Sequence, residues 1–282
     1  MNVKPPFAYY GGKTRIAARI AERMPAHQHY VEPFAGSLAV LLAKRPAAME
    51  TVNDLDGDLM LFWRVLRDRT AELVRACALT PHGRAEHQAA YDLNSADEEI
   101  ERARRIWVLL SQGWTGGFTR TGWRLYLDPA GSGTSMPGYL TGYVERMAAV
   151  AERLHAVSLE CRPALEIIEA YGAHKDVLIY ADPPYLGSAR NSVKYRHEMT
   201  SDASHRELAA LLTTARACVV LSGYPSPLYD QLYAGWDRVE FHAVTAQGGA
   251  GGRRTEVLWS NRQISTPSLF GNQLASLFDQ IA

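Results

Sequence analysis

Cysteine is scarce in this chain, and none of its apolar runs is long enough to suggest a membrane span. The 282 residues include three cysteines, Cys77, Cys161 and Cys218, which lie far apart and form no CxxC pair. This spacing argues against a zinc ribbon or a disulfide scaffold and indicates three reduced thiols. No run approaches the ~18 consecutive apolar residues of a membrane helix, and residues 1–6 do not open a signal peptide. We therefore expect a cytoplasmic protein with no metal site and no membrane partner.

Net charge is lacking as well, because 30 Lys and Arg residues balance 30 Asp and Glu residues. Proteins that bind nucleic acids usually carry a basic excess, so this balance counts mildly against such a partner. The sum does not describe how charge is distributed, and a neutral chain can still present one basic cleft to phosphates. The apolar share of 47% is enough for a sizeable core, in one domain or in a core domain with a smaller second one.

Three short apolar runs end at glycine, proline or acidic residues. They cover residues 29–34, 177–181 and 218–222. Runs of this length and composition are typical of buried parallel strands. In a parallel sheet the ligand-binding crevice lies at the carboxyl ends of the strands. The unusual residues that follow these runs therefore lie where a functional site is expected.

A different pattern separates the first run from the second. Residues 57–75, 96–112 and 140–156 have helical spacing, with Arg and Glu on their polar faces. Between them, residues 113–124 are rich in glycine, aromatic and basic residues. This composition, without helical period, predicts an exposed loop or hairpin on a helical segment.

Two further helices are predicted nearer the carboxyl end. Ser204 and Glu207 form a capping-box pattern, which predicts that a helix begins at Ser204. Apolar residues at near-helical spacing within 265–282 predict a helix that docks on the body or, alternatively, contacts a second copy of the chain. We accordingly expect a monomer or a weak dimer.

Residues 182–185, Asp-Pro-Pro-Tyr, follow the second apolar run. They suit chemistry at the exocyclic amine of adenine, whose lone pair is delocalised and needs help to attack a methyl group. Acceptors against its two N–H bonds favour tetrahedral nitrogen and stabilise the developing positive charge. Asp182 and the carbonyl of Pro183 are two such acceptors on a rigid turn that includes Pro184, and Tyr185 can stack on the base. An ordinary Asp-Pro turn is the alternative for the tetrapeptide alone.

Residues 31–40 and 52–54 have the features of a nucleotide-type cofactor site. Small residues after the first apolar run allow a ligand to approach the backbone at a helix N-terminus. Glu32 suits the ammonium group of a methionine-like ligand, and Asp54, about twenty residues further on, suits ribose hydroxyls. The full Gly-x-Gly-x-x-Gly fingerprint is absent, which weakens a nicotinamide interpretation.

Two more motifs lie near the ends of the chain. Residues 9–13, Tyr-Tyr-Gly-Gly-Lys, combine a tight glycine turn with the charge of Lys13, although an exposed lysine is the alternative. The glycine-rich loop 248–252 precedes Arg253 and Arg254, whose side chains can reach phosphates. The strand-like run that follows these arginines can close the sheet.

Taken together and in this order, the motifs resemble the DNA adenine methyltransferase (Dam-like) family. Residues 9–13 resemble its opening motif, 31–40 its cofactor motif, 53–54 its ribose-binding acid and 254–259 its late strand motif; 182–185 are identical to its catalytic tetrapeptide. The resemblance implies an α/β fold with a doubly wound, Rossmann-like methyltransferase sheet and an inserted, mainly helical target-recognition domain. The implied division is 1–56 with 171–264 for the catalytic domain, 57–170 for the insertion and 265–282 for a C-terminal helix.

The resemblance also implies the reaction and its residues. Methyl would pass from S-adenosylmethionine to N6 of a flipped-out adenine in double-stranded DNA, without a metal, in a bacterium or in the bacterial host of a phage. The catalytic set is Asp182, Pro183, Pro184 and Tyr185. The cofactor set is Tyr9, Gly11, Gly12, Lys13, Glu32, Phe34, Gly36, Ser37, Asp54 and Asp182. Two positions depart from the family pattern: Tyr9 replaces a frequent Trp, and Ser37 replaces a frequent Gly.

The residues expected to contact DNA are basic or aromatic. They are Arg120, Trp123, Arg124, Lys194, Arg253 and Arg254. Trp114, Phe118 and Trp123 either read bases or anchor their loop to the helical segment. Other hypotheses are methylation of RNA adenine or of a protein glutamine, for which Asn is expected in place of Asp182, and a DNA-binding regulator without catalysis. The intact tetrapeptide and Lys13 argue against the regulator.

Overall fold

One sheet organises the chain. The computed structural model describes residues 3–126, 131, 133–186, 196, 199, 201–244 and 253–265, without the side chains of 242–244 and 253–254. Within these residues, seven strands form a sheet of order β3-β2-β1-β4-β5-β7-β6. They are β1 (His29–Glu32), β2 (Met49–Asn53), β3 (Val157–Glu160), β4 (Val177–Ala181), β5 (Cys218–Gly223), β6 (Asp237–Val244) and β7 (Arg253–Ser260). β1 to β5 run parallel, and β7 is antiparallel to β5 and β6, which confirms the α/β fold.

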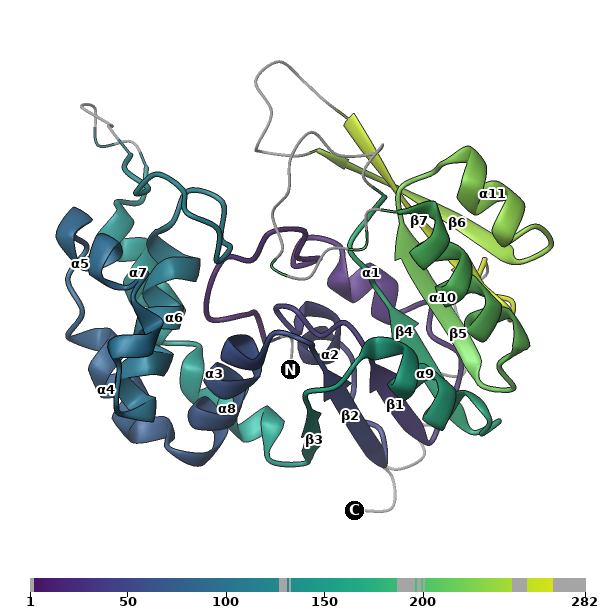
Figure 1. Cartoon of the computed structure of the whole chain (residues 1–282), viewed down its shortest axis with the longest axis horizontal. Coiled ribbons are helices and arrows are strands. Elements are labelled where there is room, and N and C mark those ends of the chain that lie inside the picture. Colours follow the sequence, from purple (N-terminus) through teal and green to yellow (C-terminus); the bar gives the residue numbers. More distant parts are fainter. Residues whose placement is uncertain are drawn as a thin grey trace, which may run out of the picture.

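Helices cover both faces of the sheet, because neighbouring residues of each central strand point to opposite sides. Tyr30 of β1 and Leu178 of β4 pack with α1 (Ala17–Ala21) and α2 (Ala39–Ala43). Val31 and Ile179, one position further along, pack with α9 (Ala164–Gly172), α10 (Asp202–Thr214) and α11 (Pro227–Leu232). β4 and β5 are buried along their whole length, as expected for strands covered on both sides. The predicted doubly wound sheet is confirmed (Figure 1).

The remaining helices form a body beside the sheet (Figure 1). They are α3 (Gly57–Asp68), α4 (Thr70–Ala78), α5 (Arg84–Ala89), α6 (Glu99–Gln112), α7 (Met136–Val144) and α8 (Met147–Leu154), with a 3₁₀ turn at Leu93–Ser95. The segment 57–75, predicted as helical, divides into two helices at Arg69, where the backbone leaves helical geometry (φ −130°, ψ 43°). The predicted helical segment 140–156 likewise divides between α7 and α8.

The boundary expected at residue 170 between insertion and catalytic domain differs from the observed strand pairing. β3 lies within 57–170 and α9 begins within it, yet β3 pairs with β2 in the main sheet. Ile167 of α9 is buried in the same cluster as Ile179 of β4. The helical body beside the sheet therefore ends with α8, and the chain returns to the sheet at β3.

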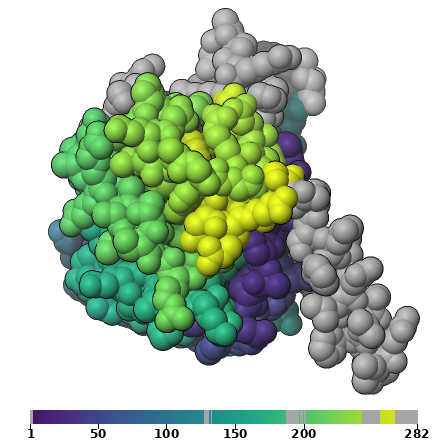
Figure 2. All heavy atoms as spheres, turned by 90° about the vertical axis from the view of Figure 1, so that its right-hand side faces the viewer, coloured from purple at the N-terminus to yellow at the C-terminus, as the bar shows by residue number. Residues whose placement is uncertain are grey.

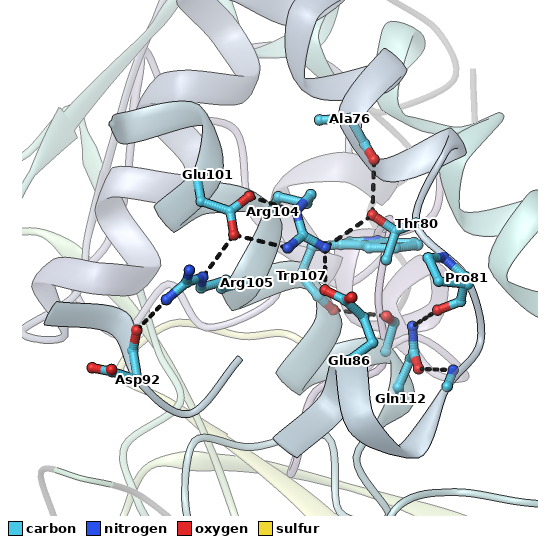
Figure 3. A network of polar contacts seen from close by, with 12 residues as sticks. Ala76, Thr80, Pro81, Glu86, Asp92, Glu101, Arg104, Arg105, Trp107 and Gln112 are labelled. Carbon is cyan, nitrogen blue, oxygen red and sulfur yellow. Dashed lines mark hydrogen bonds and ion pairs between the residues drawn. The ribbon is translucent and has the colours of Figure 1, made fainter. Parts of the chain in front are cut away.

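Ion pairs within the helical body neutralise the arginines of its central helix, α6 (Figure 3). Arg104 pairs with Glu101 at 2.7 Å and with Glu86 at 2.5 Å. Arg105 pairs with the other oxygen of Glu101 at 2.7 Å and donates to the carbonyl of Asp92. These guanidinium groups hold α5 and the 3₁₀ turn against α6 and are thus engaged within the fold.

The first and last described segments of the chain lie side by side (Figure 2). Arg23, just after α1, donates to the carbonyl of Ile264 at 3.2 Å. The helix predicted to begin at Ser204 begins at Asp202 instead, because Ser201 is the N-cap and accepts from the amide of Ser204. The predicted C-terminal helix lies, from residue 266 on, outside the described residues. None of the described helices has the length and apolar character needed to cross a membrane.

Candidate active site

A cavity of about 300 Å³ opens where β1, β2 and β4 end. Its walls come from segments that are far apart in the sequence: residues 9–13, 32–37 and 54–56, the loop 116–118, and Asp182 with Pro184. Every residue of the predicted cofactor set is among them. The cavity lies at the carboxyl ends of parallel strands, where the direction of the strands leads one to expect a ligand site.

The turn after β1 requires glycine at position 36. Gly36 has φ +47°, and a Cβ on it would lie 3.0 Å from Cε1 of the Tyr9 ring. Its amide donates to Asp54 at 2.9 Å, and its carbonyl accepts from the indole of Trp63 at 3.2 Å. A Cβ on Gly12 would lie 3.1 Å from the Ser37 hydroxyl, so the two glycine turns pack directly on each other. Backbone and aromatic ring thus form a cradle without room for another side chain.

Asn53 and Asp54 hydrogen-bond to the segments that follow β1, β2 and β3 and hold them in place. Asn53 is fully buried; it donates to the carbonyls of Pro33 and Arg162 and accepts from the amide of Arg162 at 2.8 Å. Asp54 accepts from the amide of Gly36 and, with its other oxygen, from that of Asp56 at 3.0 Å. The ribose-holding role expected of Asp54 is compatible with these bonds and stays a prediction.

Glu32 is a buried acid at the floor of the cavity. It is 3% exposed and accepts a hydrogen bond from the hydroxyl of Tyr30 at 2.9 Å. Burial raises the pKa of Glu32 to about 8, with the negative charge of Asp182 adding to the effect. A neutral acid of this kind ionises when a cation binds beside it, which fits the predicted contact with an ammonium group.

The raised pKa of Glu32 makes stability depend on pH. The unfolded chain ionises this group near its ordinary value of 4.5, whereas the folded chain does so only near 8. The stability contributed by the neutral acid is therefore lost as pH rises from about 4.5 to about 8. We expect Glu32→Gln to raise the Tm at about pH 8 by about 2–4 °C or more and to have little effect at about pH 5.

Thermal unfolding without cofactor, at both pH values, measures this effect. Glu166→Gln is the matched control, because Glu166 is half-exposed and pairs with Arg162 on the surface. An equal Tm gain from Glu32→Gln at both pH values would contradict the assignment.

Lys13 and Asp182 form the central ion pair of the site. The Nζ atom of Lys13 lies 2.7 Å from Oδ2 of Asp182 and donates to the carbonyl of Gly11 at 2.9 Å. The side chains are 7% and 17% exposed. Burial opposes the charge of Lys13, but the carboxylates of Asp182 and Glu256 raise its pKa above the ordinary value. Burial raises the pKa of Asp182 to about 6, against the opposing effect of Lys13.

Tyr185 faces a second carboxylate rather than the cavity. Its hydroxyl donates to Glu256 of β7 and lies 3.1 Å from Oδ1 of Asp182. Its ring contacts Tyr224 at a centroid distance of 4.4 Å, and the Nζ atom of Lys13 lies 4.9 Å from its centroid. Stacking of this ring on a base therefore stays a prediction. Pro184 lines the cavity, whereas Pro183 is buried beside it.

Sequence reasoning missed three residues that contribute to the site. Glu256 and Ser222 meet at 2.6 Å behind Tyr185. Arg196 lines the cavity, pairs with Asp58 at 2.5 Å and lies over the ring of Phe118 at 4.3 Å. Only Glu256 carries a signal in the sequence, because a lone acid within an apolar strand needs a partner; Ser222 and Arg196 are inconspicuous.

The hairpin of the helical body holds three of the aromatic and basic residues expected at DNA. Hydrogen bonds from Trp114 to Gly122 and from Arg124 to Gln112 pair its two sides. Trp123 stacks on His82 at 4.4 Å, which supports the anchoring interpretation, whereas Trp114 is 58% exposed. Lys194 and the side chains of Arg253 and Arg254 lie outside the described residues, so their predicted contacts stay untested.

The residues present fit S-adenosylmethionine. Tyr9, Gly36 and Asp54 line the cavity with an aromatic ring, bare backbone and a carboxylate, and the buried Glu32 suits an ammonium group. Among the described residues, no group of three or more His, Cys, Asp or Glu side chains could hold a metal ion.

Comparison with known proteins places this geometry in a family. The type II methyltransferase M.MjaIII of Methanocaldococcus jannaschii is 24% identical over 264 residues, 84% of this chain and 90% of that protein. The DNA adenine methylase of Salmonella typhi is 24% identical over 238 residues, 79% of this chain and 81% of that protein. A solved SAM-dependent methyltransferase from Agrobacterium tumefaciens gives a TM-score of 0.35 at 11% identity, over 88% of this chain and 59% of that one. A TM-score this low supports no conclusion about the chain.

The family model for D12 class N6 adenine-specific DNA methyltransferases matches residues 9–111 and 143–247. These two segments include the glycine cradle, the strand-end acids and the tetrapeptide at Asp182. Because the match extends over more than half of the sequence, the chain belongs to the D12 class of N6 adenine-specific DNA methyltransferases.

Proposed function

We propose that the chain methylates N6 of an adenine that has been flipped out of double-stranded DNA, with S-adenosylmethionine as the methyl donor. The observation that carries this proposal is the position of Asp182: it directly follows β4, it lines the cavity, and Lys13 holds its carboxylate at 2.7 Å. A base in the stack is out of reach of such a buried group, so the target must leave the duplex, at a cost of roughly a few kcal/mol.

The cavity residues hold and orient the cofactor. Glu32 would accept from its ammonium group and Asp54 from its ribose hydroxyls, while Tyr9 and Gly36 would bound the adenosyl group. When bound, S-adenosylmethionine supplies a methyl group on a positively charged sulfur, which keeps the bonding electrons as the methyl leaves. The apolar walls from Phe34 and Phe118 would keep water from the reacting atoms.

Asp182 acts on the amino group of the target base. Its Oδ1 would accept one N–H of N6, which localises the nitrogen lone pair and stabilises the positive charge that N6 gains. The same oxygen is the acceptor for the proton that N6 loses once it carries the methyl group. Lys13 holds Oδ2, so that Oδ1, which lies 3.1 Å from the Tyr185 hydroxyl, is the oxygen that would accept from N6.

Labelled-methyl transfer tests the proposal directly. The purified chain would be incubated with methyl-labelled S-adenosylmethionine and unmodified duplex DNA, and the DNA digested to nucleosides. We expect the label in N6-methyldeoxyadenosine at a defined sequence. Label in 5-methylcytosine, in RNA or in protein glutamine, or no transfer at all, would contradict the proposal.

Three arginines near the hairpin suit a DNA surface, because in the described part of the chain no carboxylate pairs with them. Arg84 lies over the ring of Trp123 at 5.0 Å and Arg120 over that of Tyr91 at 5.2 Å. Arg124 lies over the exposed ring of Tyr126 at 5.0 Å. The arginines of α6, in contrast, are neutralised by acids of the same body (Figure 3). Guanidinium groups that lie beside aromatic rings and have no carboxylate partner are suited to phosphates and bases.

Arg120→Ala is expected to weaken DNA binding by about 3- to 10-fold at about 0.1 M salt and to lower the salt dependence by about one phosphate contact. Fluorescence anisotropy with a labelled duplex at several salt concentrations measures both. Arg64→Ala is the matched control, because Arg64 is a similarly exposed arginine of the same body that pairs with Glu99 at 2.5 Å. Equal losses for the two variants would contradict the assignment of this surface.

A further inference from the structure

Glu256 is a carboxylate buried in the middle of β7. Side chains alternate along this strand: Val257 and Trp259 belong to the core on one face of the sheet, and Leu258 belongs to the core on the other. Glu256 therefore points to the same face as Leu258, where it is 7% exposed. A charge so placed needs polar partners, because burying it alone is costly.

The partners of Glu256 all belong to the site. Its Oε1 accepts from the hydroxyl of Ser222 at 2.6 Å and from the hydroxyl of Tyr185, and it lies 3.7 Å from the Nζ atom of Lys13. Ser222 comes from β5, Tyr185 follows β4, and Lys13 comes from the amino-terminal turn. Oε1 of Glu256 thus contacts residues from three different segments of the site.

Tyr185 has one hydroxyl proton and two carboxylates within reach. Burial, together with the charges of Asp182 and Glu256, raises the pKa of Tyr185 well above its ordinary value, so the hydroxyl stays protonated. It lies 3.1 Å from Oδ1 of Asp182, and its contact with Glu256 is shorter. A single proton serves one strong hydrogen bond at a time. While Glu256 accepts this proton, Oδ1 of Asp182 keeps its lone pairs for another donor.

We infer that Glu256 is a positioning residue for methyl transfer: it draws the Tyr185 proton away from Asp182 and so leaves Oδ1 free for the amino group of adenine. The inference rests on the proposed function, in which Asp182 accepts from N6. Glu256 has a second effect. With Asp182 it sets two carboxylates against the one ammonium of Lys13, which leaves negative charge where N6 becomes positive.

Two variants test the path through Tyr185. With saturating DNA and cofactor, Glu256→Ala should lower the single-turnover rate by about 10- to 100-fold, because the Tyr185 hydroxyl then donates to Asp182. Adding Tyr185→Phe should raise the rate of this variant by about fivefold or more, because no proton then competes for Oδ1. A merely structural role predicts further loss in the double variant, and a double variant no faster than Glu256→Ala would overturn the inference.

Glu256→Gln gives an independent readout that keeps the shape of the side chain. The groups that act on Asp182 are Lys13, Glu256, Tyr185, Glu32, Tyr180 and Tyr229. The charge of Glu256 raises the pKa of Asp182, so its removal should move the acid limb of the single-turnover pH–rate profile to lower pH than in the wild type. An unmoved or raised midpoint would overturn the inference.

Glu240→Gln on the neighbouring strand is the matched control, because Glu240 is exposed and pairs with Arg238 at 2.7 Å. It should leave both the rate and the pH profile unchanged. Inactivity of the wild type toward DNA, or full activity of Asp182→Ala, would remove the proposed function along with the inference. Suppose instead that the wild type methylates DNA and that Asp182→Ala is strongly impaired. Wild-type kinetics for both Glu256 variants would then contradict the inference alone.

Discussion

Replacing Asp182 with alanine is expected to lower the single-turnover rate of methyl transfer by about 10³-fold, the scale seen when one preorganised polar contact to a developing charge is lost. Affinity for DNA should change little, because Asp182 lines the cavity, whereas Trp123 and the arginines near it do not. The fold should persist, since Lys13 keeps a second carboxylate, Glu256, at 3.7 Å. The loss would thus fall on the chemical step and not on binding.

Rapid-quench assays with preformed complexes measure this step apart from product release. Asp182→Asn adds a comparison of nearly equal volume, in which one oxygen acceptor remains and the charge is lost. It should lie between alanine and wild type. Asp176→Asn, an exposed acid just before β4, is the control and should match wild type. Turnover by Asp182→Ala within about tenfold of wild type would contradict the role assigned to Asp182.

The sequence was sufficient to locate the cavity because its walls follow from strand direction. Glu32 and Asp182 each end or follow an apolar run, and the carboxyl ends of parallel strands meet on one edge of a sheet. It was not sufficient to find β3, since only Val157 of its four residues is buried and no alternation is visible. The break at Arg69 was equally hidden, because the apolar spacing of α3 continues into α4 without a proline or glycine.

The site itself was predicted less completely than its location. Lys13 was a candidate for the cofactor, but no local pattern indicates that its ammonium group pairs with Asp182 from the other half of the chain. The positive φ of Leu38 (57°) at the start of α2 could likewise not be predicted from the sequence. Leucine seldom adopts such a φ, and tertiary packing imposes it here. Glu256 was predicted only as part of a strand, because the sheet order that brings it to Tyr185 cannot be seen in the sequence.

Lys13→Met should show whether the ion pair tunes Asp182. In the wild type the rate should rise with pH through about 6, as Asp182 ionises. Lys13 lowers the pKa of Asp182, so its loss must raise that pKa and move the rise to higher pH. At about pH 7 and saturating cofactor we expect a loss of about 10- to 100-fold, part of which returns as pH increases.

The same substitution leaves two buried carboxylates without their ammonium partner, which destabilises the fold by about 3–5 kcal/mol where both are ionised. Urea unfolding beside the kinetic profile therefore verifies that the enzyme assayed is folded. Lys175→Met, at an exposed lysine before β4, is the control for loss of a positive charge. A pH–rate profile of Lys13→Met that keeps the wild-type midpoint would show that Asp182 titrates without Lys13, and the electrostatic part of the mechanism would then be wrong.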